Sequence, residues 1–343
     1  MKDFDIFCVS ESKVIDGTEI NNFTTFNLEN RTKNYKKPGI HGLHVYITNH
    51  LAKTCTQISD KDFYCNLVIW IKVAECFILG ALYIPYEGSR FHNTSIYDDL
   101  SLDICTIKSK FDLPILLMGD FNSRTGNAND IMMIESQDNI LDASNFKYPN
   151  IINILNSLDM PITRVNKDTK TNNNGKRLIE MCKLQELCIL NGRVGLDRNI
   201  GNLTFDYKST IDYMICTPDL LHKISHCEVD TLDYTISDKH NPIQLSINVE
   251  GNITREDRPL EETEIPAKES ITKCKWNDSK KDEYQMSFDE RRINPMCALP
   301  SFASYLQINS QLSNFLLISK FAEFASNLVS EIAIRSRLTK FLS

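Results

Sequence analysis

Two polar residues at the end of a predicted strand are the first candidates for chemistry. The apolar run 114–118 is followed directly by Gly-Asp-Phe-Asn at 119–122. A short apolar run closed by turn residues predicts a buried strand. Because side chains repeat every second residue along a strand, Asp120 and Asn122 share one face. A carboxylate beside a neutral amide can bind a phosphate ester next to a divalent cation. The alternative explanation is an ordinary strand-to-turn junction, because Gly, Asp and Asn are common turn residues.

Five further candidates have acidic, phenolic or imidazole side chains and lie at the ends of other predicted strands: Glu11, Tyr83, Asp212, Asp238 and His240. Glu11 and Tyr83 close strands, Asp212 opens one, and Asp238 and His240 come just before the last strand of the core. Each of them alone has an ordinary structural explanation. Together they are the groups that a metal-dependent phosphoesterase needs.

The elements that must position these residues alternate between short strands and helices, as in an α/β protein. Runs rich in β-branched and aromatic residues predict strands at 4–9, 43–47, 63–71, 77–84, 114–118, 211–215 and 243–249. Apolar residues at helical spacing predict helices at 95–107, 151–158 and 176–188. In the last of these helices, apolar residues form one stripe, which indicates a face toward the core. The stripe consists of Leu178, Met181, Leu184, Leu187 and Cys188.

Five segments carry a resemblance to a known family: residues 8–13, 80–85, 118–126, 211–213 and 237–243. Through them the chain resembles the endonuclease/exonuclease/phosphatase superfamily and, within it, the endonuclease domain of non-LTR retrotransposons, from about residue 3 to about residue 249. The Gly-Asp-Phe-Asn segment together with the closing Asp/His segment is the most specific part. The resemblance implies a four-layered α/β sandwich, in which two packed, mainly antiparallel sheets are flanked by helices.

The resemblance also implies roles around a Mg²⁺ ion, for which Mn²⁺ could substitute. Glu11 would coordinate the metal, and Asp238 would add to the network of metal and water. Asp120 would orient or deprotonate the attacking water, and Asn122 would hold the phosphate beside it.

The remaining residues are implied to act on the phosphate. Tyr83 would contact the scissile phosphate, and Asp212 would orient His240 and fix its protonation. His240 would hydrogen-bond the phosphoryl oxygen as charge develops there. The implied reaction is in-line hydrolysis of a phosphodiester, with DNA as the expected substrate.

Two departures from the family pattern lead us to expect a weakened site. The family begins one strand earlier, with an Asn that helps to hold metal and phosphate, and no such strand precedes the Glu11 strand here. We therefore expect the N-terminal strand to be missing, which would expose an edge of the Glu11 strand. Secondly, Lys239 separates Asp238 from His240, whereas an Asp directly precedes the His in many members.

A change in composition near residue 250 divides the chain. We expect 1–249 to form the endonuclease/exonuclease/phosphatase domain and 250–283, which is charged and contains proline, to form a linker. Apolar residues at 321, 324, 325, 328, 329 and 332 predict that 284–343 is a helical segment with an apolar face. A helix separated from its neighbour in a larger polypeptide is preferred over a helix on a membrane surface.

Bulk properties limit the cellular setting and the partners. The chain has 343 residues, and its 42% hydrophobic and 24% charged residues are ordinary for a soluble globular protein. Eleven irregularly spaced cysteines without a signal peptide or membrane span indicate a nuclear or cytoplasmic protein that is not secreted. The net charge of −7 argues against tight, nonspecific DNA binding but not against a nuclease, because a metal site itself uses carboxylates.

Three functions remain open at this point. The preferred interpretation is a DNA-nicking endonuclease of the retrotransposon type, whose natural partner would be a downstream reverse transcriptase domain. A phosphatase of the same fold would act on inositol lipids or nucleotides instead. An inactive or domesticated remnant would use the fold as a binding module.

Overall fold

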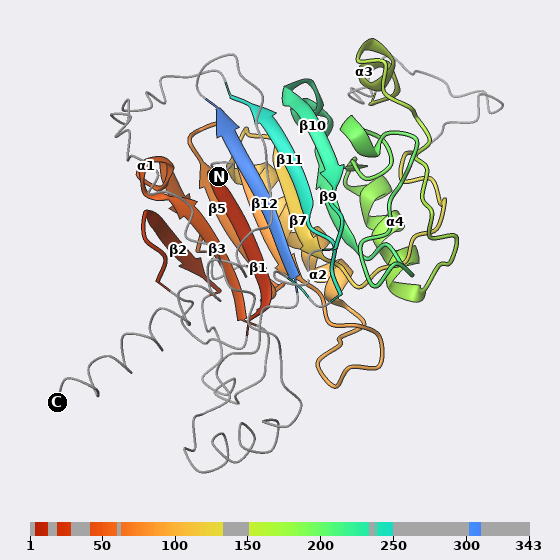
Figure 1. The fold of residues 1–343 in the computed structure, drawn as a ribbon, viewed down its shortest axis with the longest axis horizontal. Helices are drawn as coiled ribbons and strands as arrows, with labels where there is room; N and C mark the ends of the chain where they lie inside the picture. The colour runs from red at the N-terminus through yellow and green to blue at the C-terminus, as the bar shows by residue number, and fades with distance from the viewer. Residues whose placement is uncertain are drawn as a thin grey trace, which may run out of the picture. The chain divides into compact units, whose positions relative to one another are not determined.

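The strands form two six-stranded sheets (Figure 1). The computed structural model describes residues 4–12, 19–28, 42–59, 63–132, 151–232, 237 and 239–249, together with the backbone of 302–309. The first sheet runs in the order β10 (Ile224–Val229), β11 (Ile243–Asn248), β12 (Phe302–Asn309), β1 (Ile6–Ser12), β3 (Gly42–Thr48) and β2 (Phe23–Asn27). The second runs in the order β4 (Cys55–Gln57), β5 (Val68–Val73), β6 (Phe77–Tyr83), β7 (Ile115–Asp120), β9 (Asp212–Cys216) and β8 (Cys188–Ile189).

Most neighbouring strands are antiparallel. Each sheet contains one parallel pair, β11 with β12 and β6 with β7. The helices are α1 (Asn49–Ala52), α2 (Ile96–Lys110), α3 (Ile151–Ser157) and α4 (Asn173–Leu184), with the 3₁₀ helices η1 (Gly195–Asp197) and η2 (Pro218–Lys223). No helix in the described part of the chain is long and apolar enough to cross a membrane.

The second sheet has an apolar core on each face. On the face toward the first sheet, the Cys8 thiol of β1 donates to Met118 Sδ of β7, 3.5 Å away. On the opposite face, α2 and α4 pack against the sheet: Leu100 of α2 and Leu178 of α4 are fully buried in one cluster with Leu117 of β7. This arrangement confirms the predicted α/β sandwich of two packed, mainly antiparallel sheets flanked by helices.

Two local predictions within this fold are wrong. The helix predicted to continue to Cys188 ends at Leu184, because Glu186 has a φ of 51° and Cys188 begins a strand that pairs with β9. Residues 302–309, inside the segment expected to be helical, form a strand because their backbone pairs with both β1 and β11. The edge of β1 that was expected to be exposed is therefore paired. The predicted linker and the rest of 284–343 lie outside the described residues.

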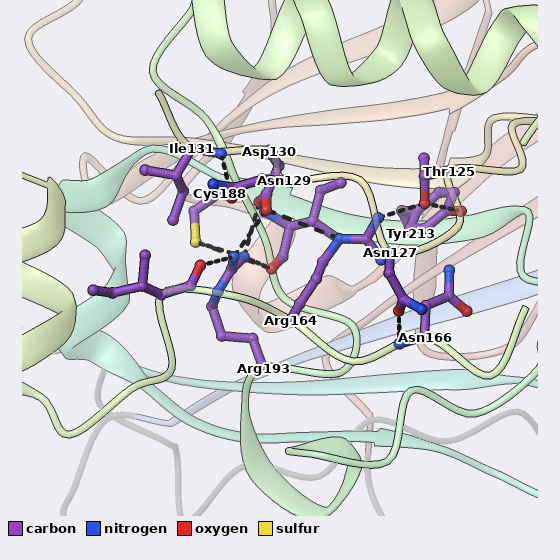
Figure 2. Close-up of polar contacts among 12 residues, drawn as sticks. Thr125, Asn127, Asn129, Asp130, Ile131, Arg164, Asn166, Cys188, Arg193 and Tyr213 are labelled. Atoms are coloured by element: carbon purple, nitrogen blue, oxygen red, sulfur yellow. Dashed lines mark hydrogen bonds and ion pairs between the residues drawn. The ribbon is translucent and has the colours of Figure 1, made fainter. Parts of the chain in front are cut away.

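A buried ion-pair cluster joins the loop after β7 to the segments around β8 (Figure 2). Nη1 and Nη2 of Arg193 each donate to one oxygen of Asp130 at 2.8 Å, and both side chains are fully buried. Asp130 also accepts the backbone N–H of Ile189 at 2.8 Å. Arg164 Nε lies 3.9 Å from Asp130, and its Nη2 donates to Thr125. The cluster thus anchors Thr125 and Asp130, in the segment that follows β7, to Arg164 and Arg193.

Candidate active site

Three of the predicted site residues occupy matching positions on neighbouring strands. Tyr83 at the end of β6 is the register partner of Asp120 at the end of β7. Asp120 is in turn the register partner of Asp212 at the start of β9. Because register partners lie side by side, the sheet itself brings a phenol and two carboxylates together. All three side chains are buried.

The turn after β7 directs Asn122 back toward Asp120. Gly119 has a φ of +144°, and a Cβ there would lie 1.9 Å from the carbonyl oxygen of Leu82, so glycine is required. Asn122 has a φ of 46°, in the left-handed region that Asn tolerates better than most residues. Its backbone N–H and its Nδ2 both donate to the Asp120 carboxylate, at 2.7 and 3.1 Å. The amide therefore holds the carboxylate in place.

Glu11 belongs to the first sheet but contacts the same group of residues. It lies at an irregularity in β1, where the register with β3 shifts between Val9 and Ser12, and its φ is 53°. Such a bulge changes the direction of a side chain and is often found at functional sites. The Tyr83 hydroxyl donates to the Glu11 carboxylate. This contact links the two sheets at the candidate site.

His240 and Asp212 form a buried pair. His240 Nδ1 lies 3.1 Å from both carboxylate oxygens of Asp212. The ring of Phe205 packs edge-on against the imidazole, with ring centroids 4.7 Å apart. Ser237 Oγ accepts the backbone N–H of His240 at 2.9 Å, and Thr204 Oγ1 accepts that of Asp212 at 3.1 Å. These contacts determine the orientation of the imidazole.

Burial and charge shift the pKa values of the group. Burial, and next the neighbouring Asp212 carboxylate, raise the pKa of Asp120 well above its ordinary value. Burial also raises the pKa of Asp212, although His240 opposes this. Burial alone would lower the pKa of His240, but Asp212, Asp120 and Glu11 together raise it to about 9, so the imidazole is protonated at neutral pH. Burial and the hydrogen bond to Glu11 raise the pKa of Tyr83, which keeps its phenol a donor.

The donor atoms of this group fit a hard divalent cation. Ligand atoms of Asp120, Asp212 and His240 lie within 4.8 Å of one another. The carboxylate of Glu11, which the Tyr83 hydroxyl contacts, lies in the same region, so the group offers oxygen ligands of the kind that a hard divalent cation prefers. The raised pKa of Asp120 reflects unfavourable negative charge, which a cation would neutralise. The residues present therefore fit a hard divalent cation.

An ion pair that sequence reasoning missed supports the site. Arg124 donates through Nε and Nη2 to the two oxygens of Asp168, at 2.8 and 2.6 Å. Asp168 also accepts the backbone N–H of Thr210 at 3.1 Å, two residues before Asp212. The pair thus ties the turn after β7 to the start of β9. No local pattern could have found it, because the two residues lie 44 positions apart.

The beginning of α4 is tied to the same turn. Asn172, which precedes α4, accepts the N–H groups of Gly175 at 2.7 Å and Arg124 at 2.9 Å, and it donates to the carbonyl of Asn122 at 3.1 Å. A Cβ on Gly175 would lie 1.9 Å from the carbonyl oxygen of Arg124, so the helix approaches the turn closely. A helix-capping Asn is a recognisable sequence signal. It could have placed the start of this helix earlier than residue 176.

The structure places six of the seven predicted site residues in one region. Asp120 lies at the centre: its register partners are Tyr83 and Asp212, and Asn122 donates to its carboxylate. Glu11 contacts Tyr83, and His240 contacts Asp212. The seventh, Asp238, lies outside the described residues, so its role stays a prediction.

Comparisons with known proteins identify similar solved structures. No family model and no curated protein matches the chain. The chain is similar to the endonuclease domain of TRAS1, a telomere-specific non-LTR retrotransposon, with 15% identity and a TM-score of 0.40 over 65% of this chain and 78% of that chain. It is similar to an AP endonuclease from Archaeoglobus fulgidus, with 13% identity and a TM-score of 0.39 over 69% and 86% of the two chains. It is also similar to the 3′ phosphatase NExo from Neisseria, solved with a product DNA hairpin, with 12% identity and a TM-score of 0.43 over 71% and 88%.

Proposed function

We propose that this chain is a metal-dependent phosphodiesterase of the endonuclease/exonuclease/phosphatase superfamily that nicks DNA, as an endonuclease of the retrotransposon type. The observation that carries the proposal is the convergence of acidic, phenolic and imidazole side chains from four strands and the segment before β11: Glu11, Tyr83, Asp120, Asp212 and His240. Burying several ionisable groups together is costly, so a group of this kind indicates a functional site.

In the proposed reaction, the oxygen of a water molecule forms a bond to the phosphorus of a phosphodiester, and the bond from phosphorus to one sugar oxygen breaks. That oxygen takes up a proton from solvent water and leaves as a hydroxyl group. Asp120, whose carboxylate is held by Asn122 and has a raised pKa, orients the water and accepts its proton. Asp212 keeps His240 protonated, and the imidazolium stabilises the negative charge that develops on the phosphoryl oxygen. When bound, Mg²⁺ held by Glu11 would supply positive charge that polarises the phosphate. Tyr83 positions Glu11 through its hydroxyl.

Two parallel assays separate this proposal from its alternatives. The first measures conversion of supercoiled plasmid to open circles in Mg²⁺, and the second measures phosphate release from inositol phosphates and nucleotides. We expect nicking without phosphate release. Phosphate release without nicking would favour a phosphatase. DNA binding without either reaction would favour a binding module.

Nicking is expected to require a divalent cation. Chelation by EDTA should lower the rate by at least about 10²-fold, and Mg²⁺ or Mn²⁺ should restore it. Glu11→Gln should raise the Mg²⁺ concentration needed for half-maximal nicking by about tenfold or more, because it removes a charged ligand. Mg²⁺ is expected to raise the Tm of the wild-type protein, because it binds the folded state, and Glu11→Gln should abolish this increase. Glu75→Gln, at an exposed acid paired with Lys72, is the control, and nicking that persists in EDTA would contradict the proposal.

Removing the hydroxyl of Tyr83 is expected to weaken the site without disturbing the fold. Tyr83→Phe keeps the buried ring but deprives Glu11 of a donor, so we expect a loss of nicking of about tenfold. The rate should be measured at several Mg²⁺ concentrations. Tyr64→Phe, at an exposed tyrosine, provides the comparison. Equal rates for the two variants would exclude a role for the Tyr83 hydroxyl.

A further inference from the structure

One strand holds the first sheet together. β12 pairs antiparallel with β1 on one side and parallel with β11 on the other (Figure 1). Among the described strands, it is the only neighbour that β1 and β11 share. Without it, the sheet would separate into the pair β10-β11 and the group β1-β3-β2.

The two parts of the sheet that β12 joins carry different parts of the candidate site. The first residue of β12 pairs with Ser10, which directly precedes Glu11. Two residues later, Ser304 pairs with Ile243, which follows His240 by three positions. The beginning of β12 therefore lies between the strand that carries Glu11 and the segment that carries His240. Hydrogen bonds along β12 fix the spacing between these two.

A long stretch of sequence connects β12 to its parallel neighbour. Roughly 50 residues separate β11 from β12, whereas a parallel pair needs a crossover of only about a dozen. A sequence of this length does not by itself require β12 to lie beside β11, so the place of β12 in the sheet depends on its pairing with β1 and β11. Withdrawal of β12 would leave two unpaired strand edges facing one slot, and such edges are templates for the addition of a strand.

We propose that residues 302–309 are a removable strand, which the slot between β1 and β11 binds as it would bind a peptide. Insertion of this strand assembles the site, because it fixes Glu11 relative to His240. The occupant of the slot is this chain's own segment. The effect on the site rests on the proposed function, whereas the binding of the strand does not.

Cys8 provides a reporter for this slot. It is a free, buried cysteine on β1, and its register partner on β12 is Ser304. Cα atoms of opposed residues in an antiparallel pair lie about 4.5–5.5 Å apart, which a disulfide can bridge. A peptide of residues 300–311 with Ser304→Cys, activated as a pyridyl disulfide, is incubated with the full-length protein. Mass spectrometry then locates the adduct, and a peptide with Ala303→Cys, opposite Val9, is the control.

The Ser304→Cys peptide is expected to modify Cys8 at least about tenfold faster than the control peptide, because only its thiol is in register with Cys8. Equal rates for the two peptides would overturn the proposal.

A full-length variant tests whether the strand can be replaced. Tyr305→Pro removes a backbone N–H in the middle of β12, so it should speed modification of Cys8 and lower nicking, each by about tenfold. An unmodified peptide of residues 300–311 should restore nicking, and Tyr305→Val should behave as wild type. If Tyr305→Pro binds the peptide but its nicking is not restored, the link between the strand and the site is refuted. A third outcome is possible: the Ser304→Cys peptide modifies Cys8 selectively, but neither the wild type nor any variant nicks DNA. This outcome would support the strand proposal and refute the proposed function.

Discussion

Replacing Asp120 by Asn, or His240 by Ala, is expected to lower the rate of DNA nicking by about 10²-fold or more. Asp120→Asn keeps the size of the side chain but removes the charge that accepts a proton from water. His240→Ala removes the imidazolium that Asp212 holds in place. Initial rates on supercoiled plasmid in saturating Mg²⁺ measure both effects.

The two variants need a control for charge and for folding. Asp219→Asn is suitable, because Asp219 is exposed in η2, beyond the opposite end of β9 from Asp212. Burial and repulsion destabilise the Asp120 carboxylate, so Asp120→Asn should unfold at a temperature equal to or above that of the wild type. A stable Asp120→Asn protein that nicks as fast as the wild type would exclude Asp120 from catalysis.

Replacing Arg193 by Met is expected to lower the free energy of unfolding by about 3–5 kcal/mol, because it leaves the buried Asp130 carboxylate without its main partner. Arg164, with its Nε 3.9 Å away, compensates only in part. Urea unfolding at pH 7, followed by circular dichroism, measures the change. Arg198→Met is the matched control, since its ion pair with Asp159 is exposed and should contribute at most about 1 kcal/mol.

The dependence on pH distinguishes lost charge from lost packing. Burial raises the pKa of Asp130, but Arg193 outweighs this effect and lowers the pKa below its ordinary value of 3.8. A folded-state pKa below the unfolded value contributes stability that is present above about pH 4 and is lost as the pH falls through the folded-state pKa. In Arg193→Met, burial favours the protonated acid. The difference in the free energy of unfolding between the wild type and Arg193→Met should therefore narrow below pH 4. A difference that stays constant with pH would indicate lost packing instead of lost charge.

The residues that lie at strand ends were predictable from the sequence. Apolar runs locate β6, β7 and β9, and the polar residue that closes or opens each run is Tyr83, Asp120 or Asp212. Their exact alignment across three strands is a matter of register, which depends on the pairing of distant segments. The bulge at Glu11 was not predictable either, because a left-handed φ at a Glu has no sequence signal.

Several strands were missed because their sequences are weak signals. Strands β2, β4 and β10 are short or contain several polar residues, and they take strand conformation through pairing with β3, β5 and β11. Contacts between distant residues, such as Arg124 with Asp168, were missed for a related reason. Local sequence reports the preference of a segment, whereas these features depend on which other segment lies beside it.

The alignment of Tyr83, Asp120 and Asp212 also constrains how the gene can change. Adding or deleting one residue within β7 would turn each side chain beyond that point to the opposite face of the sheet, and Asp120 would then face away from Asp212. Such an indel would change no catalytic residue, yet its effect should match that of losing the carboxylate. Indels in surface loops carry no such penalty. The number of residues in β7 is therefore as much a part of the active site as Asp120 itself.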